Sequence, residues 1–160
     1  MQLYLAAIGR LKKGPEQELV SRYSDRLAKT GKQVGLSGIS TIEIVESRAR
    51  DAKSRKRDEA DQMLARLPEN CPIFAFDEQG ASPDSAGFAS LMEKQIESGL
   101  PALALVIGGP DGLDQGIRNR ANRIISFGAA TFPHQLVRVL VLEQVYRCVT
   151  ILTNHPYHRS

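Results

Sequence analysis

Short apolar runs alternate with longer amphipathic segments along the whole chain, and this order limits the fold more than any other feature. The apolar runs predict strands at residues 3–8, 41–46, 73–76, 102–107 and 123–126. The other segments predict helices that begin at Pro15 and Ser82 or cover residues 51–67, 115–121 and 133–152. A repeated order of strand and helix predicts an α/β fold in which helices flank a mostly parallel sheet.

Proline, serine and glycine residues predict where individual helices begin and end. Pro15 suits the first position of a helix, and apolar residues follow it at intervals of four. Ser82 and Pro83 have the chemistry of an N-cap and a first helical residue, and Gly99 suits the position beyond the end of that helix. We therefore expect the third helix to begin at Ser82.

The length of 160 residues fits a single domain that spans residues 1–160. No apolar run reaches the roughly 18 residues that cross a bilayer, and the basic residues near the start follow the apolar stretch, which is the wrong order for a secretory signal. We therefore expect a soluble, cytoplasmic protein. Cys71 and Cys148 are far apart and belong to no CxxC motif, so no metal site is expected.

Three consecutive predicted strands run into loops that are rich in small residues. These loops are FDEQG (76–80), IGGPDG (107–112) and SFGAATFP (126–133). Any one of them could be a simple turn, but ligands of open α/β sheets bind at the carboxyl ends of the strands, and three such loops together favour a pocket. The chain lacks GxGxxG and GxxxxGK[ST] motifs, so the pocket suits an adenine and ribose contacted mainly by backbone.

The last predicted helix has apolar residues on nearly every side. Because one sheet covers one face only, we expect the opposite face to meet a second copy of the chain. A central core helix in a monomer is the alternative, and it is less favoured because a terminal helix is seldom central. His134 with Arg138 and Glu143 with Arg147 are spaced four apart, so each pair shares a helix face. An ion pair between Glu143 and Arg147 is as well supported as a catalytic role.

The segment SRARDAKSRKR (47–57), called the basic segment below, carries six cationic residues and one acid. A cationic run of this kind usually forms a solvated helix face. Near a cofactor pocket it would also suit a phosphate backbone. The six cations are Arg48, Arg50, Lys53, Arg55, Lys56 and Arg57.

Three motifs together resemble one known family. IGGPDGL, TFPHQLVRVLVLEQVYR and the terminal PYHR are similar to the RlmH family of ribosomal RNA large subunit methyltransferases, within the SPOUT superfamily. The resemblance covers the whole chain. It implies a C-terminal trefoil knot, a homodimer, S-adenosylmethionine as methyl donor, and N3-methylation of a pseudouridine in the 23S rRNA of the assembled ribosome. It also implies a catalytic domain without a separate RNA-binding domain.

The resemblance also implies the site residues. The expected cofactor pocket consists of Phe76, Gly108, Phe127, Gly128, Ala129, Ala130, Thr131 and Phe132. Tyr157, His158 and Arg159 of the terminal motif are the expected catalytic residues. A guanidinium would stabilise the charge that develops on the base when N3 loses its proton, so we assign that role to Arg159. His158 or Tyr157 would position the base or accept the proton. In a dimer this tail could serve the pocket of the partner.

Two other functions are compatible with the same residues. One is a ribosome-binding protein that keeps the fold without catalysis, and the intact PYHR tail argues against it. The other is a different nucleotide-dependent α/β enzyme, which the missing phosphate-binding motifs disfavour.

Overall fold

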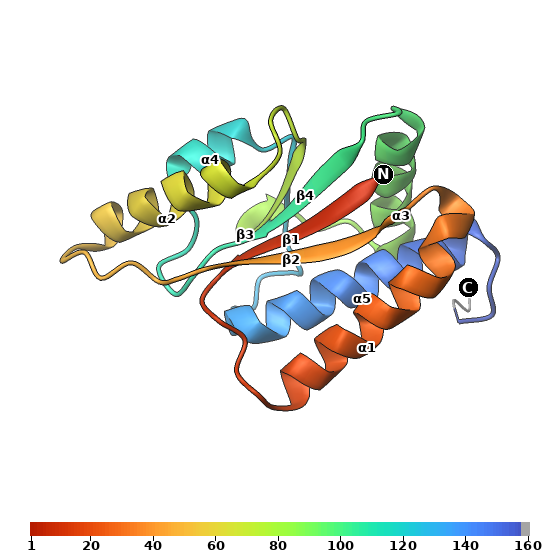
Figure 1. The fold of residues 1–160 in the computed structure, drawn as a ribbon, viewed down its shortest axis with the longest axis horizontal. Coiled ribbons are helices and arrows are strands. Elements are labelled where there is room, and N and C mark those ends of the chain that lie inside the picture. Colours follow the sequence, from red (N-terminus) through yellow and green to blue (C-terminus); the bar gives the residue numbers. More distant parts are fainter. Residues whose placement is uncertain (158–160) are drawn as a thin grey trace.

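The computed structural model describes residues 1–157 and contains one sheet of parallel strands in the order β2-β1-β4-β3-β5 (Figure 1). The strands are β1 (Gln2–Ile8), β2 (Gly38–Ile44), β3 (Ile73–Ala81), β4 (Ala102–Ile107) and β5 (Arg123–Ile125). The helices are α1 (Pro15–Thr30), the 3-10 helix η1 (Gly31–Val34), α2 (Ala52–Arg66), α3 (Ser85–Glu97), α4 (Gln115–Arg120) and α5 (His134–Leu152). Every strand pair is parallel, so the predicted α/β architecture is confirmed.

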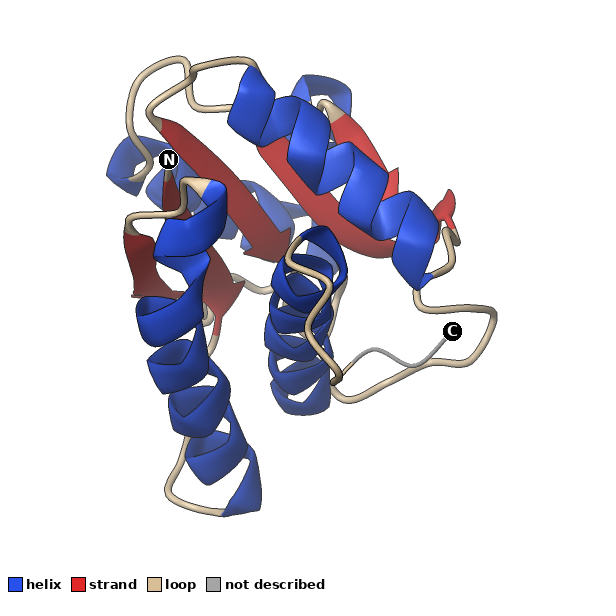
Figure 2. Ribbon diagram, turned by 90° about the vertical axis from the view of Figure 1, so that its right-hand side faces the viewer, coloured by secondary structure: helices blue, strands red, loops and turns tan. Residues whose placement is uncertain are grey.

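Helices cover both faces of the sheet (Figures 1 and 2). Successive side chains of a strand point to opposite faces, so Leu3 and Leu5 pack in a core with α1, α3 and α5. Ala6 and Ile8 belong to a second core, which α2 and α4 complete from the other face. The chain therefore forms three layers, with the sheet in the middle.

The predicted elements are confirmed, but three of them have a boundary that differs from the prediction by more than one residue. The strand expected at 41–46 runs from Gly38 to Ile44, because it pairs along the whole length of β1. The strand expected at 73–76 runs on to Ala81, and Phe76 and Ala81 both pair with Ile125 of β5, because residues 77–80 make an excursion from the pairing. The third helix does not begin at Ser82. Its N-cap is Asp84, whose Oδ1 accepts a hydrogen bond from the Gly87 amide at 2.7 Å.

Helix α5 is the central helix of its layer, and this corrects one expectation. It lies between α1 and α3, against the sheet. Val141, Leu142 and Val145 are completely buried within the chain itself. Most of this helix is therefore covered within the chain, although Leu136 near its start is 36% exposed. The argument that a terminal helix is seldom central was wrong for this chain.

The carboxyl ends of β4, β3 and β5 lie next to one another at one edge of the sheet, where α5 also begins. This edge is where the three loops rich in small residues meet. The trefoil knot implied by the resemblance stays a prediction. Within residues 1–157, none of the helices combines the length and the hydropathy that a membrane span requires.

Candidate functional site

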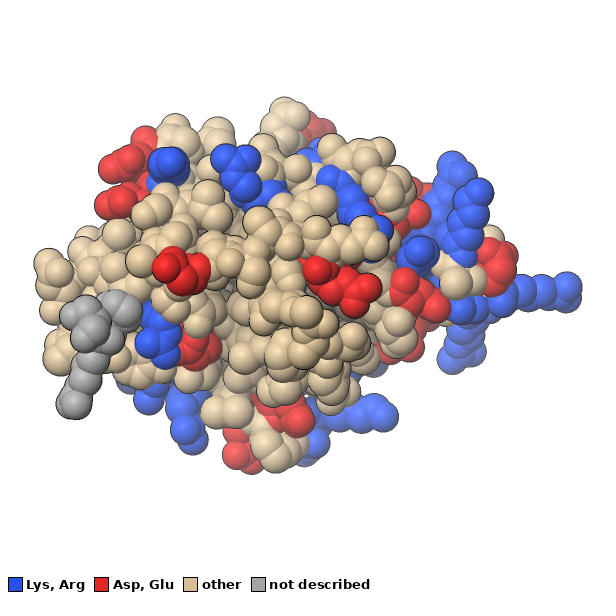
Figure 3. Space-filling view, turned by 180° about the vertical axis from the view of Figure 1, so that it is seen from behind, with Lys and Arg blue, Asp and Glu red and all other residues tan. Residues whose placement is uncertain are grey.

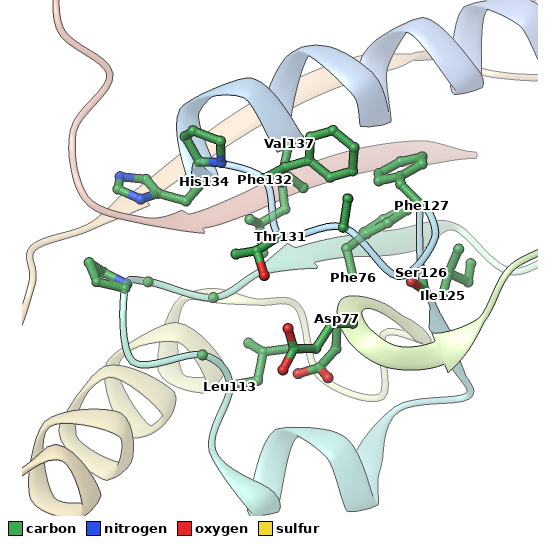
Figure 4. Close-up of a pocket in the computed structure, with 18 of the residues that line it drawn as sticks. Phe76, Asp77, Leu113, Ile125, Ser126, Phe127, Thr131, Phe132, His134 and Val137 are labelled. Carbon is green, nitrogen blue, oxygen red and sulfur yellow. The ribbon is translucent and has the colours of Figure 1, made fainter.

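A cavity of about 640 Å³ opens at this edge of the sheet (Figure 4). Its walls come from the start of the 77–80 excursion, from residues 107–113 after β4 and from the segment that joins β5 to α5. The volume lies within the roughly 300–1,000 Å³ of small-molecule pockets. The predicted convergence of three loops on one pocket is thus observed.

Gly108 and Gly109 let the loop after β4 close on itself. The amide of Gly112 donates a hydrogen bond to the Gly109 carbonyl at 2.9 Å. A Cβ on Gly108 would lie 2.9 Å from the carbonyl carbon of Gly112, and a Cβ on Gly109 would lie 2.9 Å from Cγ2 of Ile8. Because a side chain fits at neither position, the loop presents backbone groups to the cavity.

Aromatic side chains line one side of the cavity. The rings of Phe76 and Phe127 are stacked, with centroids 5.5 Å apart and planes 12° from parallel. Figure 4 shows Phe132 on the same side, with Asp77 and Leu113 across from them. The arrangement offers an apolar surface to a flat ring and leaves the polar groups on the opposite wall.

An ion pair fixes the 77–80 excursion of the chain. Arg118 of α4 donates to Oδ2 of Asp77 through Nη2 at 2.8 Å and through Nε at 3.1 Å. The Asp77 side chain is only 4% exposed. Gly80 anchors the other end of the excursion, since a Cβ there would lie 2.6 Å from the backbone of Ile124 and Ile125. The wall that carries Asp77 is therefore held by contacts with α4 and β5.

Arg138 connects α5 to the ends of two strands. Its side chain is 1% exposed, and Nη2 donates to the carbonyl oxygens of Ile8 at 2.9 Å and Gly9 at 2.6 Å. Nη1 donates to Oε1 of Glu43 at 2.6 Å. His134 lies one turn earlier on the same helix face and lines the cavity. The expectation that His134 and Arg138 share a face is confirmed, because both side chains lie beside Gly9.

The structure brings the expected cofactor residues together. Seven of the eight line the cavity, and Ala129 does not. The seven are Phe76, Gly108, Phe127, Gly128, Ala130, Thr131 and Phe132. Since these residues follow three different strands, the agreement depends on the strand order of the sheet and not on any single motif.

Of the expected catalytic residues, the structure describes only Tyr157, which does not line the cavity. Tyr157 packs edge-on against Tyr146 with centroids 4.9 Å apart, and its hydroxyl donates to Oε1 of Glu143 at 3.2 Å. Arg147 forms the predicted ion pair with Glu143 and also lies over the Tyr157 ring. Helix α5 begins at the cavity and ends at Leu152, and the chain then turns back, so that Tyr157 contacts Glu143 and Tyr146 in the middle of the helix. Tyr157 therefore lies beside the middle of α5, and it is not among the residues that line the cavity of its own chain. His158 and Arg159 lie outside the described residues.

Burial raises the pKa of the Tyr157 phenol, and the neighbouring Tyr23 hydroxyl and the Glu143 carboxylate raise it further. A phenol of this kind stays protonated near neutral pH. In the position observed, Tyr157 is a hydrogen-bond donor to Glu143 and not a base.

Some cavity residues were not predicted from the sequence. Asp77 and Arg118 form one wall, and His134 lines the cavity from the start of α5. Asp77 lies in the FDEQG loop that the sequence singled out, so its position was a usable signal. Arg118 gives no such signal, because only the packing of α4 beside β3 brings it to Asp77.

The cavity fits S-adenosylmethionine. Its aromatic side suits an adenine ring, and the glycine backbone at 108–112 leaves room for polar groups of a ligand to reach N–H and C=O groups. Three acids line the wall; Asp77 and Asp111 are paired with Arg118 and Arg55, and Glu78 has no ion-pair partner within residues 1–157, which is compatible with a cationic sulfonium. The pocket holds no glycine-rich phosphate cradle of the GxGxxG type, in keeping with a ligand that has no phosphate.

Comparison with known proteins identifies the family. The family model described as "Predicted SPOUT methyltransferase" matches residues 1–158. A relative from Methylobacterium radiotolerans named "Ribosomal RNA large subunit methyltransferase H" is 52% identical to this chain, and the match covers 100% of this chain and 98% of the relative. A relative of the same name from Xanthobacter autotrophicus is 49% identical, and the match covers 100% of both chains. The relative of that name from Rhodopseudomonas palustris is 48% identical, also over 100% of both chains. SPOUT methyltransferases use S-adenosylmethionine, so the expected cofactor is confirmed, and this chain belongs to the SPOUT methyltransferase family.

Proposed function

We propose that this protein methylates N3 of a pseudouridine in the 23S rRNA of the assembled ribosome, in the cytoplasm. Three relatives of about half-identical sequence are named as methyltransferases of the ribosomal RNA large subunit. The observation that carries the proposal for this chain is the cavity that three loops of small residues build at the carboxyl edge of the sheet. Bound there, S-adenosylmethionine supplies an electrophilic methyl group.

Holding the nucleophile in line with that methyl group is a large part of the required catalysis, on the order of 7 to 11 kcal/mol. N3 of pseudouridine carries a proton that must leave, and the negative charge then spreads onto the flanking carbonyl oxygens. We assign the stabilisation of that charge to Arg159 and the positioning of the base, or its deprotonation, to His158. Tyr157 orients this tail through its contacts with Tyr146 and Glu143.

We also propose a homodimer in which each tail serves the pocket of the partner. Tyr157 packs against the middle of α5 and does not line the cavity of its own chain. Phe132 and Leu136 are each 36% exposed, are spaced four residues apart and lie at the mouth of the cavity or next to it. An exposed apolar pair at a pocket mouth suits a subunit contact. A partner seated there would bring its own chain end to the cavity.

A methylation assay tests the activity. Ribosomes that lack the modification are incubated with the protein and a labelled methyl donor, beside naked rRNA, and the labelled nucleoside is identified by mass spectrometry. We expect N3-methylpseudouridine from the ribosomes. Absence of methyl transfer to ribosomes would contradict the proposal and would favour a ribosome-binding protein without catalysis.

Subunit mixing tests the shared site. One variant lacks residues 156–160, and the other carries Gly108→Ala in the cavity. At a donor concentration too low to fill the weakened Gly108→Ala cavity, each homodimer should be inactive, and the truncated variant should still bind S-adenosylmethionine. If tails act in trans, a mixed dimer contains one intact cavity faced by one intact tail, so mixing restores activity. Mixtures that stay inactive although mixed dimers form, shown by differently tagged subunits, would place the tail on its own subunit.

A further inference from the structure

We infer that the basic segment, residues 47–57, is a docking surface for the phosphate backbone of the RNA substrate, held in register with the cavity by Arg55. The inference rests on the proposed function, since it names the part of this chain that contacts the RNA around the target nucleoside. It concerns binding of RNA and not the chemical step.

Four cations of the basic segment are available to a partner. Arg48, Arg50, Lys53 and Arg57 are exposed, and none of them belongs to an ion pair in residues 1–157. Figure 3 shows the cationic side chains gathered at the end of the molecule where α2 begins.

Glu46, just before the segment, is exposed, whereas Asp51 within it and Asp58 just after it already accept local hydrogen bonds. Asp51 caps α2 and accepts hydrogen bonds from the Ser54 amide at 2.9 Å and the Ser54 hydroxyl at 2.8 Å. Asp58 accepts a hydrogen bond from the Ser47 hydroxyl at 2.9 Å. Because both carboxylates are turned to local backbone and hydroxyl donors, the exposed cations keep their capacity to bind an external anion.

Arg55 ties this surface to the cavity. Its Nε and Nη2 donate to the two carboxylate oxygens of Asp111 at 2.7 and 3.1 Å, and Asp111 lines the cavity. Nη1 of the same side chain donates to the carbonyl oxygens of Ala49 at 3.1 Å and Arg50 at 3.2 Å. One guanidinium therefore fixes both the loop before α2 and the loop after β4. A phosphate bound by the basic segment would lie at a defined position relative to the methyl donor.

The chemistry of the surface points to a phosphate backbone. Arginine and lysine side chains contact phosphates without reading sequence, and the segment contains no aromatic residue on which an unpaired base could stack. Double-stranded RNA is bound through its shape and its phosphates, which suits folded rRNA better than a flexible single strand. The surface would thus position the ribosomal RNA while the cavity selects the nucleoside.

Two matched variants test the inference. The docking variant carries Arg48→Gln, Arg50→Gln, Lys53→Gln and Arg57→Gln. The control variant carries Arg22→Gln, Lys29→Gln, Lys32→Gln and Lys94→Gln. These substitutions remove the same amount of charge from exposed residues of α1, η1 and α3, on the other face of the sheet. Circular dichroism and calorimetry with S-adenosylmethionine establish that both variants fold and bind the cofactor.

Ribosome binding is then measured against KCl concentration, together with kcat and KM for methylation. We expect the docking variant to raise KM for ribosomes at least tenfold with kcat within twofold. The slope of log K against log salt should flatten by about 0.7 to 0.9 for each phosphate that the variant no longer neutralises. The control variant should keep the wild-type KM and slope. Double-stranded RNA of unrelated sequence should compete with ribosomes for the wild-type protein and much less for the docking variant.

Equal KM values and salt slopes for wild type and docking variant would overturn the inference. Loss of ribosome affinity without any effect of the competing RNA would assign the surface to a ribosomal protein, and would also overturn it. Failure of the proposed function is distinguishable, because then the wild-type protein itself would transfer no methyl group to ribosomes.

Discussion

Arg138 donates a hydrogen bond to the carbonyl oxygen of Gly9 at 2.6 Å, which joins the start of α5 to the end of β1. The same guanidinium bonds the Ile8 carbonyl and the Glu43 carboxylate, while its Nε has no partner within the described residues. The cavity lies beside this contact, since His134, one turn before Arg138, lines it. A buried charge with several partners is expensive to disturb, and this yields the first prediction.

Arg138→Met should lower the free energy of unfolding by about 3 kcal/mol, because it removes the donor from two buried carbonyls and from Glu43. Urea denaturation measures the change. The matched control is Arg22→Met on the exposed surface of α1, which should change stability by no more than about 0.5 kcal/mol. Equal effects of the two substitutions would show that the Arg138 contacts contribute no net stability.

Gly108→Ala should weaken the binding of S-adenosylmethionine by more than tenfold. The new methyl group would meet the backbone of Gly112 and Leu113 at 2.9 to 3.1 Å, so the loop after β4 must open. Isothermal titration calorimetry measures the affinity. In the control Gly87→Ala, the methyl group meets only the side chains of Asp84 and Pro83, far from the cavity in the first turn of α3, and binding should be unchanged. Wild-type affinity in Gly108→Ala would show that the loop does not shape the cofactor site.

Tyr157→Phe should retain kcat within about tenfold and leave the pH dependence of kcat unchanged between pH 6 and 9. The pKa of Tyr157 is raised, mainly by burial, so its phenol stays protonated throughout that range. Phenylalanine keeps the packing on Tyr146 and removes the hydrogen bond to Glu143. Removal of a general base costs about 10² to 10⁴ in rate. A decrease of that size with an altered pH profile would make Tyr157 the base.

The stability of the protein should fall as pH rises above 9, in part because of Cys148. This thiol is 1% exposed, and burial raises its pKa from 9.0 to about 12. The folded state therefore holds its proton more tightly than the unfolded state, so stability is complete below pH 9 and declines as pH rises from 9 toward 12. Urea midpoints at pH 8 and pH 10.5 measure the decline. Cys148→Ala should reduce that difference, and an unchanged difference would exclude Cys148 as its cause.

Local patterns were sufficient for most of the fold. The run ALALVI predicts β4 with its observed bounds, because a strand buried on both faces needs apolar residues throughout. The start of α3 was predicted wrongly, since Ser82 and Asp84 both have capping side chains and only the hydrogen bond to Gly87 selects Asp84. The convergence of the three loops was also predictable, because parallel strands present their carboxyl ends at one edge.

Contacts between distant segments were not predictable in the same way. The position of α5 between α1 and α3, the pairing of Arg118 with Asp77 and the attachment of Arg55 to Asp111 each join residues that no periodicity relates. The sequence by itself determined the order of strands and helices, the small-residue loops and the family. Only the tertiary structure decided that α5 is central and that Tyr157 does not line the cavity of its own chain. The physical reason is that strand and helix patterns follow from local backbone geometry, whereas these contacts depend on how whole layers pack.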